Sequence, residues 1–198
     1  MSALKAVGLK KEFGAETLFD QVSFDVMRGD KVGFVGPNGA GKTTLMKCLL
    51  GLEELDGGTV DFAAATVGYV EQQADFSNGT LYEEFLRAFD DIIALEAKKR
   101  ELERRIADGD AKELEAYGKV VDRFEDLGGY DFESRIRHVA FGLGFTEADF
   151  KKNTTHFSGG QKTRICLTKA LLREPDFLFL DEPTNHLDIE MTQWLENF

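Results

Sequence analysis

Short runs of alternating apolar and polar residues fill the first thirty positions, a pattern typical of β-strands. Two such runs, 4–10 and 18–27, are separated by Gly14-Ala15-Glu16, which predicts a turn between them. Two more short strands are expected over 59–62 and 66–70. We therefore predict an antiparallel β-subdomain at the start of the chain.

A short apolar run, 31–35, leads into a glycine-rich loop, and residues 42–50 then show helical spacing that stops at Gly51. This order predicts a strand, a loop and a helix. The loop reads Gly36-Pro37-Asn38-Gly39-Ala40-Gly41-Lys42-Thr43, which fits the phosphate-loop pattern in the context that this pattern requires.

The residue types of this loop indicate its chemistry. Glycines at positions 36, 39 and 41 allow positive φ and let backbone N–H groups approach phosphate oxygens. The helix that begins near Gly41 adds the positive end of its dipole. Lys42 is expected to reach the β and γ phosphates, the Thr43 hydroxyl to complete a Mg²⁺ shell, and Thr44 to add a phosphate contact. An ordinary glycine turn is the alternative.

The pattern becomes helical from residue 80 onward. Thr80 and Glu83 have the spacing of a capping box, so a helix is expected to begin there. The helical pattern breaks at Asp108-Gly109-Asp110 and then resumes, which predicts an antiparallel hairpin over about 84–127. A further helix is expected over 132–143.

The hairpin is locally basic: residues 96–105 hold five basic and three acidic side chains. Two interpretations stay open. The first is a solvated face with ion pairs four residues apart, such as Glu96 with Arg100 and Glu101 with Arg105. The second is a docking surface.

Two carboxylates follow an apolar run near the end of the chain. Residues 177–180 suit a strand that is covered on both faces of a parallel sheet. Asp181 and Glu182 come next, at the edge where ligands collect in parallel α/β sheets, so they are expected to face the phosphate loop. Asp181 is assigned to Mg²⁺, directly or through water, and Glu182 to the attacking water as general base. Helix-cap chemistry is the alternative for both.

A second helix start combines a capping box with two glycines. Ser158-Gly159-Gly160-Gln161 has Ser-x-x-Gln spacing, and helical spacing of apolar residues follows up to Pro175. Each glycine in a first helical turn costs up to about 1 kcal/mol relative to alanine. Two in succession therefore indicate that a ligand such as a phosphate approaches the backbone, with capping alone as the alternative.

Composition narrows the function classes. The 198 residues carry 36 acidic and 24 basic side chains, a net charge of −12, which excludes a general polyanion binder. The length and the 42% hydrophobic content suit one domain, or one domain with an inserted subdomain. With no apolar run of about 18 residues and no secretory signal, we expect a cytoplasmic protein without a membrane partner. Cys48 and Cys166 are expected to be buried thiols rather than a disulfide or a metal pair.

The chain resembles the nucleotide-binding domain of ABC ATPases over nearly its whole length. Three segments carry the resemblance: the phosphate loop, 157–161 and 178–188. The resemblance implies an α/β fold with an N-terminal antiparallel β-subdomain, a parallel-sheet core and an inserted helical arm and signature subdomain. It implies ATP and Mg²⁺ as cofactors, with ATP held between two such domains. Within a single domain, 1–198, the implied segments are the first part of the ATP-binding core (1–79), the helical insertion (80–157) and the signature helix, Walker B and D-loop (158–198).

The resemblance also implies roles for individual residues. Ser158, Gly159, Gly160 and Gln161 are similar to the signature motif, which binds the γ-phosphate of the nucleotide on the opposing domain. Gln72 is similar to the Q-loop glutamine, which contributes to catalysis with Glu182. Phe13 lies where an aromatic ring stacks on adenine, and an ordinary core phenylalanine is its alternative. Asp188 is similar to the D-loop aspartate at the domain interface. The implied metal set is Thr43, Gln72 and Asp181.

Within that family, Asp181-Glu182-Pro183-Thr184-Asn185-His186-Leu187-Asp188 is similar to the form typical of the ABC-F subfamily, twin-domain ATPases that act on the ribosome. The hairpin resembles the ABC-F arm, and its basic charge suits contact with ribosomal RNA or tRNA. The implied function is hydrolysis of ATP to ADP and phosphate, in a translation factor or in a resistance factor that protects the ribosome from antibiotics. An ATPase subunit of a transporter and a scaffold without turnover are the alternatives.

One departure from the family pattern lies at the end of the sequence. Ten residues follow Asp188, so the switch histidine and the second ATPase domain are expected in a longer protein; His186 belongs to the D-loop string and is not that histidine. We expect this chain alone to bind nucleotide with little turnover, as a monomer or a weak head-to-tail homodimer. The preference between ATP and GTP stays open. Stacking on Phe13 contacts the face of the base, whereas adenine and guanine differ in the hydrogen-bonding groups at their edges.

Overall fold

The computed structural model describes residues 2–63, 66–70, 76 and 78–198. They form two compact units, Met1–Val67 (unit 1) and Gly68–Phe198 (unit 2). Across the described part of the chain, no helix combines the length and the apolar composition needed to span a membrane. The predicted segment boundaries near 80 and 158 stay predictions.

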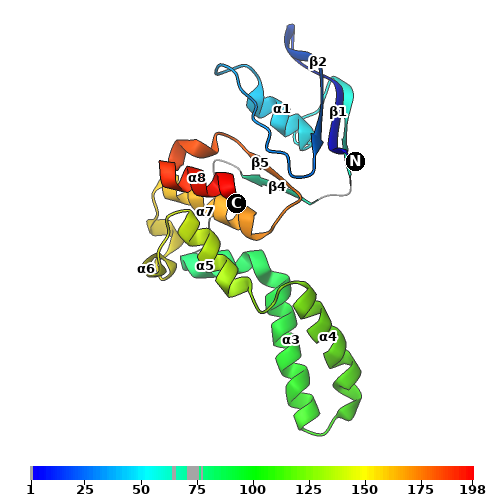
Figure 1. Ribbon diagram of the computed structural model, residues 1–198, viewed down its shortest axis with the longest axis vertical. Helices are drawn as coiled ribbons and strands as arrows, with labels where there is room; N and C mark the ends of the chain where they lie inside the picture. Colours follow the sequence, from blue (N-terminus) through cyan, green and yellow to red (C-terminus); the bar gives the residue numbers. More distant parts are fainter. Residues whose placement is uncertain (1, 64–65, 71–75, 77) are drawn as a thin grey trace. The chain divides into compact units, whose positions relative to one another are not determined.

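Unit 1 is organised by a three-stranded antiparallel sheet (Figure 1). Its strands are β1 (Ser2–Phe13), β2 (Glu16–Met27) and β3 (Gly57–Phe62), in the order β2-β1-β3. Phe13 pairs with Glu16, so Gly14 and Ala15 form a two-residue turn, in which Gly14 takes a φ of +62°. The predicted hairpin is confirmed, with strands longer than expected.

Helix α1 (Lys42–Leu49) presents one apolar face to the interior of unit 1. Its buried residues are Leu45, Met46, Cys48 and Leu49. The helix ends before Gly51, which takes a φ of +70°. Burial raises the pKa of the Cys48 thiol, as expected for a structural cysteine, whereas Cys166 is only half-buried.

The strand predicted over 31–35 is wrong, because the structure has no strand between Met27 and α1. Val35 is 97% exposed. Phe34 packs edge-on against Phe24 of β2, with the ring centroids 5.7 Å apart. A strand needs a hydrogen-bonded neighbour, and none of the described strands pairs with this run. The apolar side chain of Phe34 thus packs on β2 although the run 31–35 is not a strand.

Unit 2 contains the predicted helical insertion. Its elements are α2 (Leu81–Leu86), the 3₁₀ turn η1 (Arg87–Phe89), α3 (Asp90–Ala107), η2 (Ala111–Glu113) and α4 (Leu114–Asp126). Helices α3 and α4 lie antiparallel as a hairpin, called the arm below (Figure 1). Thr80 and Glu83 form the predicted capping box, and the hydrogen bond from the Thr80 N–H lowers the pKa of the Glu83 carboxyl.

The rest of unit 2 is a helical body beside a two-stranded sheet. Its elements are α5 (Phe132–Gly142), α6 (Glu147–Phe150), η3 (Thr154–His156), α7 (Gly159–Leu172), β5 (Phe177–Leu180), η4 (Pro183–His186) and α8 (Ile189–Asn197), with β4 (Val67–Val70) next to β5. The fully buried Phe85, Ile136 and Ile165 join α2, α5 and α7 in one core. Strand β5 is only half-buried, contrary to the expectation of two covered faces, because β4 is its single neighbour among the described strands.

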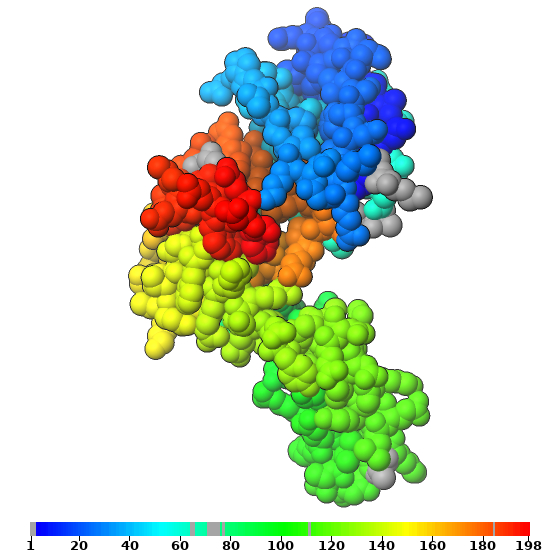
Figure 2. All heavy atoms as spheres, in the orientation of Figure 1, coloured from blue at the N-terminus to red at the C-terminus, as the bar shows by residue number. Residues whose placement is uncertain are grey.

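The arm pairs many of its charges internally, and Figure 2 shows it in green, projecting from the rest of unit 2. Its ion pairs include Arg100–Glu96, Arg104–Glu101, Arg105–Glu113 and Lys119–Glu115. The predicted partner of Arg105 is therefore wrong: the hairpin turn brings Glu113 to within 2.9 Å of it. These pairs support the solvated-face interpretation, and docking by the arm stays a proposal.

Candidate functional site

The phosphate-loop segment of unit 1 has the backbone that its motif requires. Gly39 and Gly41 take φ values of +83° and +87°, in the region that favours glycine. A Cβ at Gly41 would also lie 2.8 Å from Leu18 Cγ. Gly41 is the N-cap of α1, and no side chain caps this helix start. The start of α1 therefore has no side-chain cap, and helix starts of this kind bind anions.

Gly36 differs from the other two loop glycines. It does not use the positive φ that glycine allows, and a Cβ there would make an ordinary 3.5 Å contact with Ala40. Its carbonyl is used instead: Lys42 Nζ donates to Gly36 O at 2.9 Å and to Pro37 O at 3.0 Å. The ammonium group is thus held against the loop that it is predicted to share with phosphate. Thr43 and Thr44 follow it in the first turn of α1.

Phe13 lies at the end of β1, in the same unit as the phosphate loop. The residue is 55% exposed, which excludes the alternative of an ordinary core phenylalanine. Lys11 Nζ lies 5.2 Å from the ring centroid. An exposed aromatic face of this kind can stack on a base.

The signature segment of unit 2 begins α7 with a complete capping box. Ser158 Oγ accepts a hydrogen bond from the Gln161 N–H at 3.4 Å, and Gln161 Oε1 accepts one from the Ser158 N–H at 2.9 Å. Capping is therefore present at this helix start. The box uses the N–H groups of Ser158 and Gln161 and leaves those of Gly159 and Gly160 outside it.

The two signature glycines have different surroundings. A Cβ at Gly160 would lie 3.2 Å from His186 Nδ1, so this glycine is explained by a close side chain of the same chain. No signal in the sequence spacing indicates that contact. A Cβ at Gly159 would meet nothing within 4 Å. No close contact of the described residues therefore explains Gly159, and approach of a ligand to it stays a prediction.

Asp181 and Glu182 follow β5, as predicted. Glu182 takes a φ of +47°, an uncommon conformation for a residue with a side chain, and such strain gathers at functional sites. Its Oε2 accepts a hydrogen bond from Asn185 Nδ2 at 2.7 Å, which orients the carboxylate. Sequence reasoning named Asn185 only as part of the segment 181–188 and missed its contact with Glu182. Its position three residues after Glu182 is the available signal, because one 3₁₀ turn brings such residues together.

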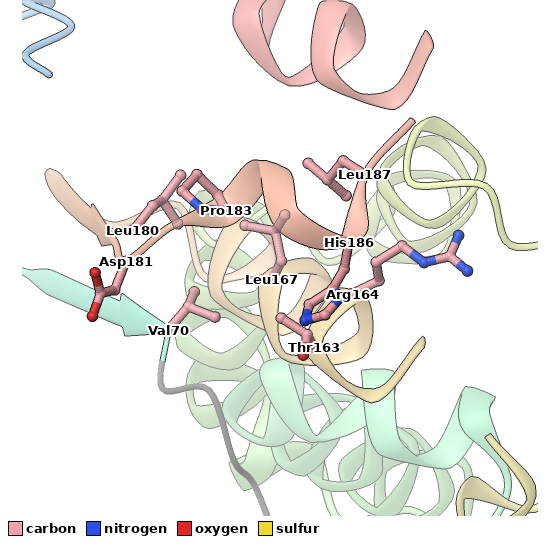
Figure 3. Close-up of a pocket in the computed structure, with 9 residues that line it drawn as sticks. All are labelled: Val70, Thr163, Arg164, Leu167, Leu180, Asp181, Pro183, His186 and Leu187. Atoms are coloured by element: carbon pink, nitrogen blue, oxygen red, sulfur yellow. The ribbon is translucent and has the colours of Figure 1, made fainter. Parts of the chain in front are cut away.

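A hollow lies where the two strands of unit 2 meet α7 and η4 (Figure 3). Its lining residues are Val70, Thr163, Arg164, Leu167, Leu180, Asp181, Pro183, His186 and Leu187. Figure 3 shows the Asp181 carboxylate and the Arg164 guanidinium at opposite ends of it. A mostly apolar lining suits packing of these elements rather than binding of a triphosphate.

The structure thus places the predicted residues in two groups. Phe13 and the phosphate loop are in unit 1, whereas the signature segment, Asp181, Glu182 and Asp188 are in unit 2. Asp188 caps α8, where its carboxylate accepts a hydrogen bond from the Met191 N–H at 2.9 Å. Gln72, predicted to act in catalysis and metal binding, lies outside the described residues.

An antiparallel β-unit with a phosphate loop, and a helical unit with a signature helix and two carboxylates after a strand, define an ATP-binding domain of the ABC type. The chain belongs to the ABC transporter family, whose model matches residues 19–185. A solved structure, described as the ATP-binding subunit of an ABC transporter, has the same fold: the TM-score is 0.68 at 22% identity, over 99% of this chain and 72% of the other. The predicted fold class is confirmed.

Curated relatives extend this similarity. The Bacillus subtilis protein YdiF is 42% identical over 100% of this chain and 32% of its own length. ABC transporter F family member 5 of Arabidopsis thaliana is 35% identical, with shares of 100% and 30%. The energy-dependent translational throttle protein EttA of Mycobacterium tuberculosis is 33% identical, with shares of 95% and 34%. The chain spans about a third of the length of these relatives, and its similarity to an F family member agrees with the predicted subfamily.

Proposed function

We propose that this chain is an ATP-binding domain of a twin-domain ABC-F ATPase that acts on the ribosome, as a translation factor or a ribosome-protecting resistance factor. The observation that carries nucleotide binding is the start of α1, where Gly39 and Gly41 take positive φ and no side chain caps the helix, the backbone that a phosphate loop requires. The ribosomal part rests on the Asp181–Asp188 string and on relatives such as the translational throttle protein. The transporter alternative shares the fold with this chain.

In unit 1, different loop residues bind different parts of the nucleotide. The amides of the loop and of the first turn of α1 bind the phosphates, and Lys42 exchanges its contacts with two loop carbonyls for the β and γ phosphates. Thr44 adds a contact. The exposed ring of Phe13 stacks on adenine.

The proposed metal site suits Mg²⁺. The Thr43 hydroxyl, the Gln72 amide oxygen and the Asp181 carboxylate are hard oxygen donors, the type that Mg²⁺ takes in addition to phosphate oxygens and water. When bound, Mg²⁺ neutralises negative charge on the phosphates. Glu182, held through Oε2 by Asn185, orients and deprotonates water through Oε1.

The signature residues of unit 2 act on a nucleotide held by the second ATPase domain. Gly159 and Gly160 offer their amides and Ser158 its hydroxyl to that γ-phosphate, and Asp188 lies at the same interface. The isolated chain binds nucleotide with little turnover, as a monomer or a weak head-to-tail dimer. Basic residues of the arm contact ribosomal RNA or tRNA, and this contact weakens with added salt.

Cosedimentation of the full-length protein with ribosomes tests this function. Glu182→Gln removes the base that deprotonates water, so in the presence of ATP it is expected to hold the protein on the ribosome in a stable complex. Glu190→Gln, an exposed carboxylate on α8, is the matched control and leaves release unchanged. No association of the Glu182→Gln protein in ATP would end the ribosomal proposal, and copurification with a membrane protein would favour the transporter alternative.

A further inference from the structure

Arg164 occupies a junction of three segments of unit 2. It lies on α7, six residues after Ser158, and its Nη1 donates to the carbonyl of Leu143 at the end of α5, at 3.1 Å. The same nitrogen lies 3.5 Å from Met191 Sδ on α8, and the guanidinium carbon lies 5.4 Å from the Phe145 ring centroid. These partners are neutral groups. Arg164 therefore joins α7 to the end of α5 and to α8 through neutral groups.

Met191 connects this junction to the D-loop. Its backbone N–H donates to Asp188 Oδ1 at 2.9 Å, the hydrogen bond that caps α8. Its side chain contacts Arg164. A displacement of Met191 would therefore move the Asp188 carboxylate as well.

Two glycines allow α8 to lie unusually close to the end of α5. A Cβ at Gly142 would overlap the indole of Trp194, and a Cβ at Gly144 would overlap the terminal methyl group of Met191. His186, just before the D-loop aspartate, lies against Gly160 at the start of α7. The D-loop segment is thus held against the signature helix at Gly160 and, through Arg164, about one turn further along.

We propose that Arg164 is a positioning residue that fixes the signature helix α7 against the D-loop helix α8. Ser158 and Asp188 then face the second domain as parts of one rigid surface. The inference rests on the proposed function, because this surface affects turnover only if the second domain holds a nucleotide against it. Arg164 belongs to unit 2 and the phosphate loop to unit 1, so we expect nucleotide binding by the loop to be unchanged in an Arg164 variant.

The chain has one tryptophan, Trp194 on α8. Its fluorescence emission depends on how closely α8 packs against α5. Arg164→Ala disturbs the packing of α8 from the side of α7, and Gly142→Ala disturbs it from the side of α5. Arg173→Ala, at the exposed end of α7, is the matched control. Trp194 emission, acrylamide quenching and ATP affinity are measured on this chain. The kcat for ATP hydrolysis is measured on the full-length protein.

We expect Arg164→Ala to shift Trp194 emission to longer wavelength and to lower kcat about ten- to a hundredfold, the cost of a small misplacement of catalytic groups. ATP affinity of unit 1 stays unchanged, and Arg173→Ala changes nothing. Gly142→Ala gives the same pattern although alanine is the better helix former, and it decides the question if Arg164→Ala does not fold.

Unchanged emission, or shifted emission with unchanged kcat, would overturn the assignment. A parallel loss of ATP affinity, kcat and thermal stability would also overturn it, because a merely structural role predicts that pattern. Failure of the proposed function can be distinguished from failure of this inference. If the wild-type full-length protein has no ATPase activity, both are contradicted. If the wild type is active and Arg164→Ala changes neither Trp194 emission nor kcat, only this inference is contradicted.

Discussion

Two helices of this chain begin beside glycines, and their beginnings are built in opposite ways. Helix α1 starts at Gly41, in a left-handed conformation and without a side-chain cap. Helix α7 starts at Ser158, in an extended conformation and with a complete capping box. A bare start gains much from an anion, whereas a capped start is stable before any ligand arrives. The start of α1 thus suits the proposed site for the nucleotide of this domain, and the start of α7 suits the proposed site that contacts the nucleotide of a second domain.

The largest expected effect concerns the bare start. Lys42→Ala removes the cation proposed for two phosphates, and charge-assisted hydrogen bonds contribute about 1.5–3 kcal/mol each. ATP affinity should therefore fall by about a hundredfold or more, as measured by titration calorimetry. Lys47→Ala, later on the same helix, is the control and should leave affinity unchanged. Equal affinity of Lys42→Ala and wild type would remove the proposed site.

A glycine pair sharpens the comparison at the capped start. Gly159 and Gly118, the latter within α4, both have open space where a Cβ would lie, and neither has a positive φ. Alanine at either position should therefore preserve or raise stability, by up to about 1 kcal/mol in urea denaturation. In the full-length protein only Gly159→Ala should reduce turnover, by about tenfold or more, because its Cβ blocks phosphate from a stabilising amide. Full activity of Gly159→Ala would show that no ligand approaches this backbone.

The smallest expected effect separates capping from ligand binding. Ser158→Ala and Thr80→Ala each remove the hydroxyl of one capping box. Each should lose about 1 kcal/mol of unfolding free energy, measured by urea denaturation of this chain. Only Ser158→Ala should also lower kcat in the full-length protein. If both variants retain full kcat, the Ser158 hydroxyl acts as a helix cap and nothing more.

Sequence reasoning succeeded where the interacting groups lie within one turn of each other. The capping boxes at Thr80 and Ser158, the Gly14 turn and the Glu96–Arg100 pair all depend on neighbours two to four residues away. The positive φ of Gly39 and Gly41 has the same local origin. These features could be predicted because the backbone geometry of a turn or helix determines which groups meet.

The failures involve partners distant in the sequence. The run 31–35 lacks the neighbouring strand that its pattern requires, and β5 has one such neighbour among the described strands. Arg105 takes Glu113 across the hairpin turn rather than Glu101 on its own helix. The contact of His186 with Gly160 and the junction at Arg164 likewise have no local signal.

The sequence by itself predicted the candidate chemistry of this protein: a lysine-bearing phosphate loop, a signature serine and carboxylates after a strand, each recognisable because it is contiguous. The tertiary structure decided which of those glycines serve the fold, how α8 is seated on α5, and that Arg164 joins the signature helix to the D-loop helix. The physical reason is that side chains far apart along the chain meet only when whole helices pack, and packing depends on shapes that no short segment contains.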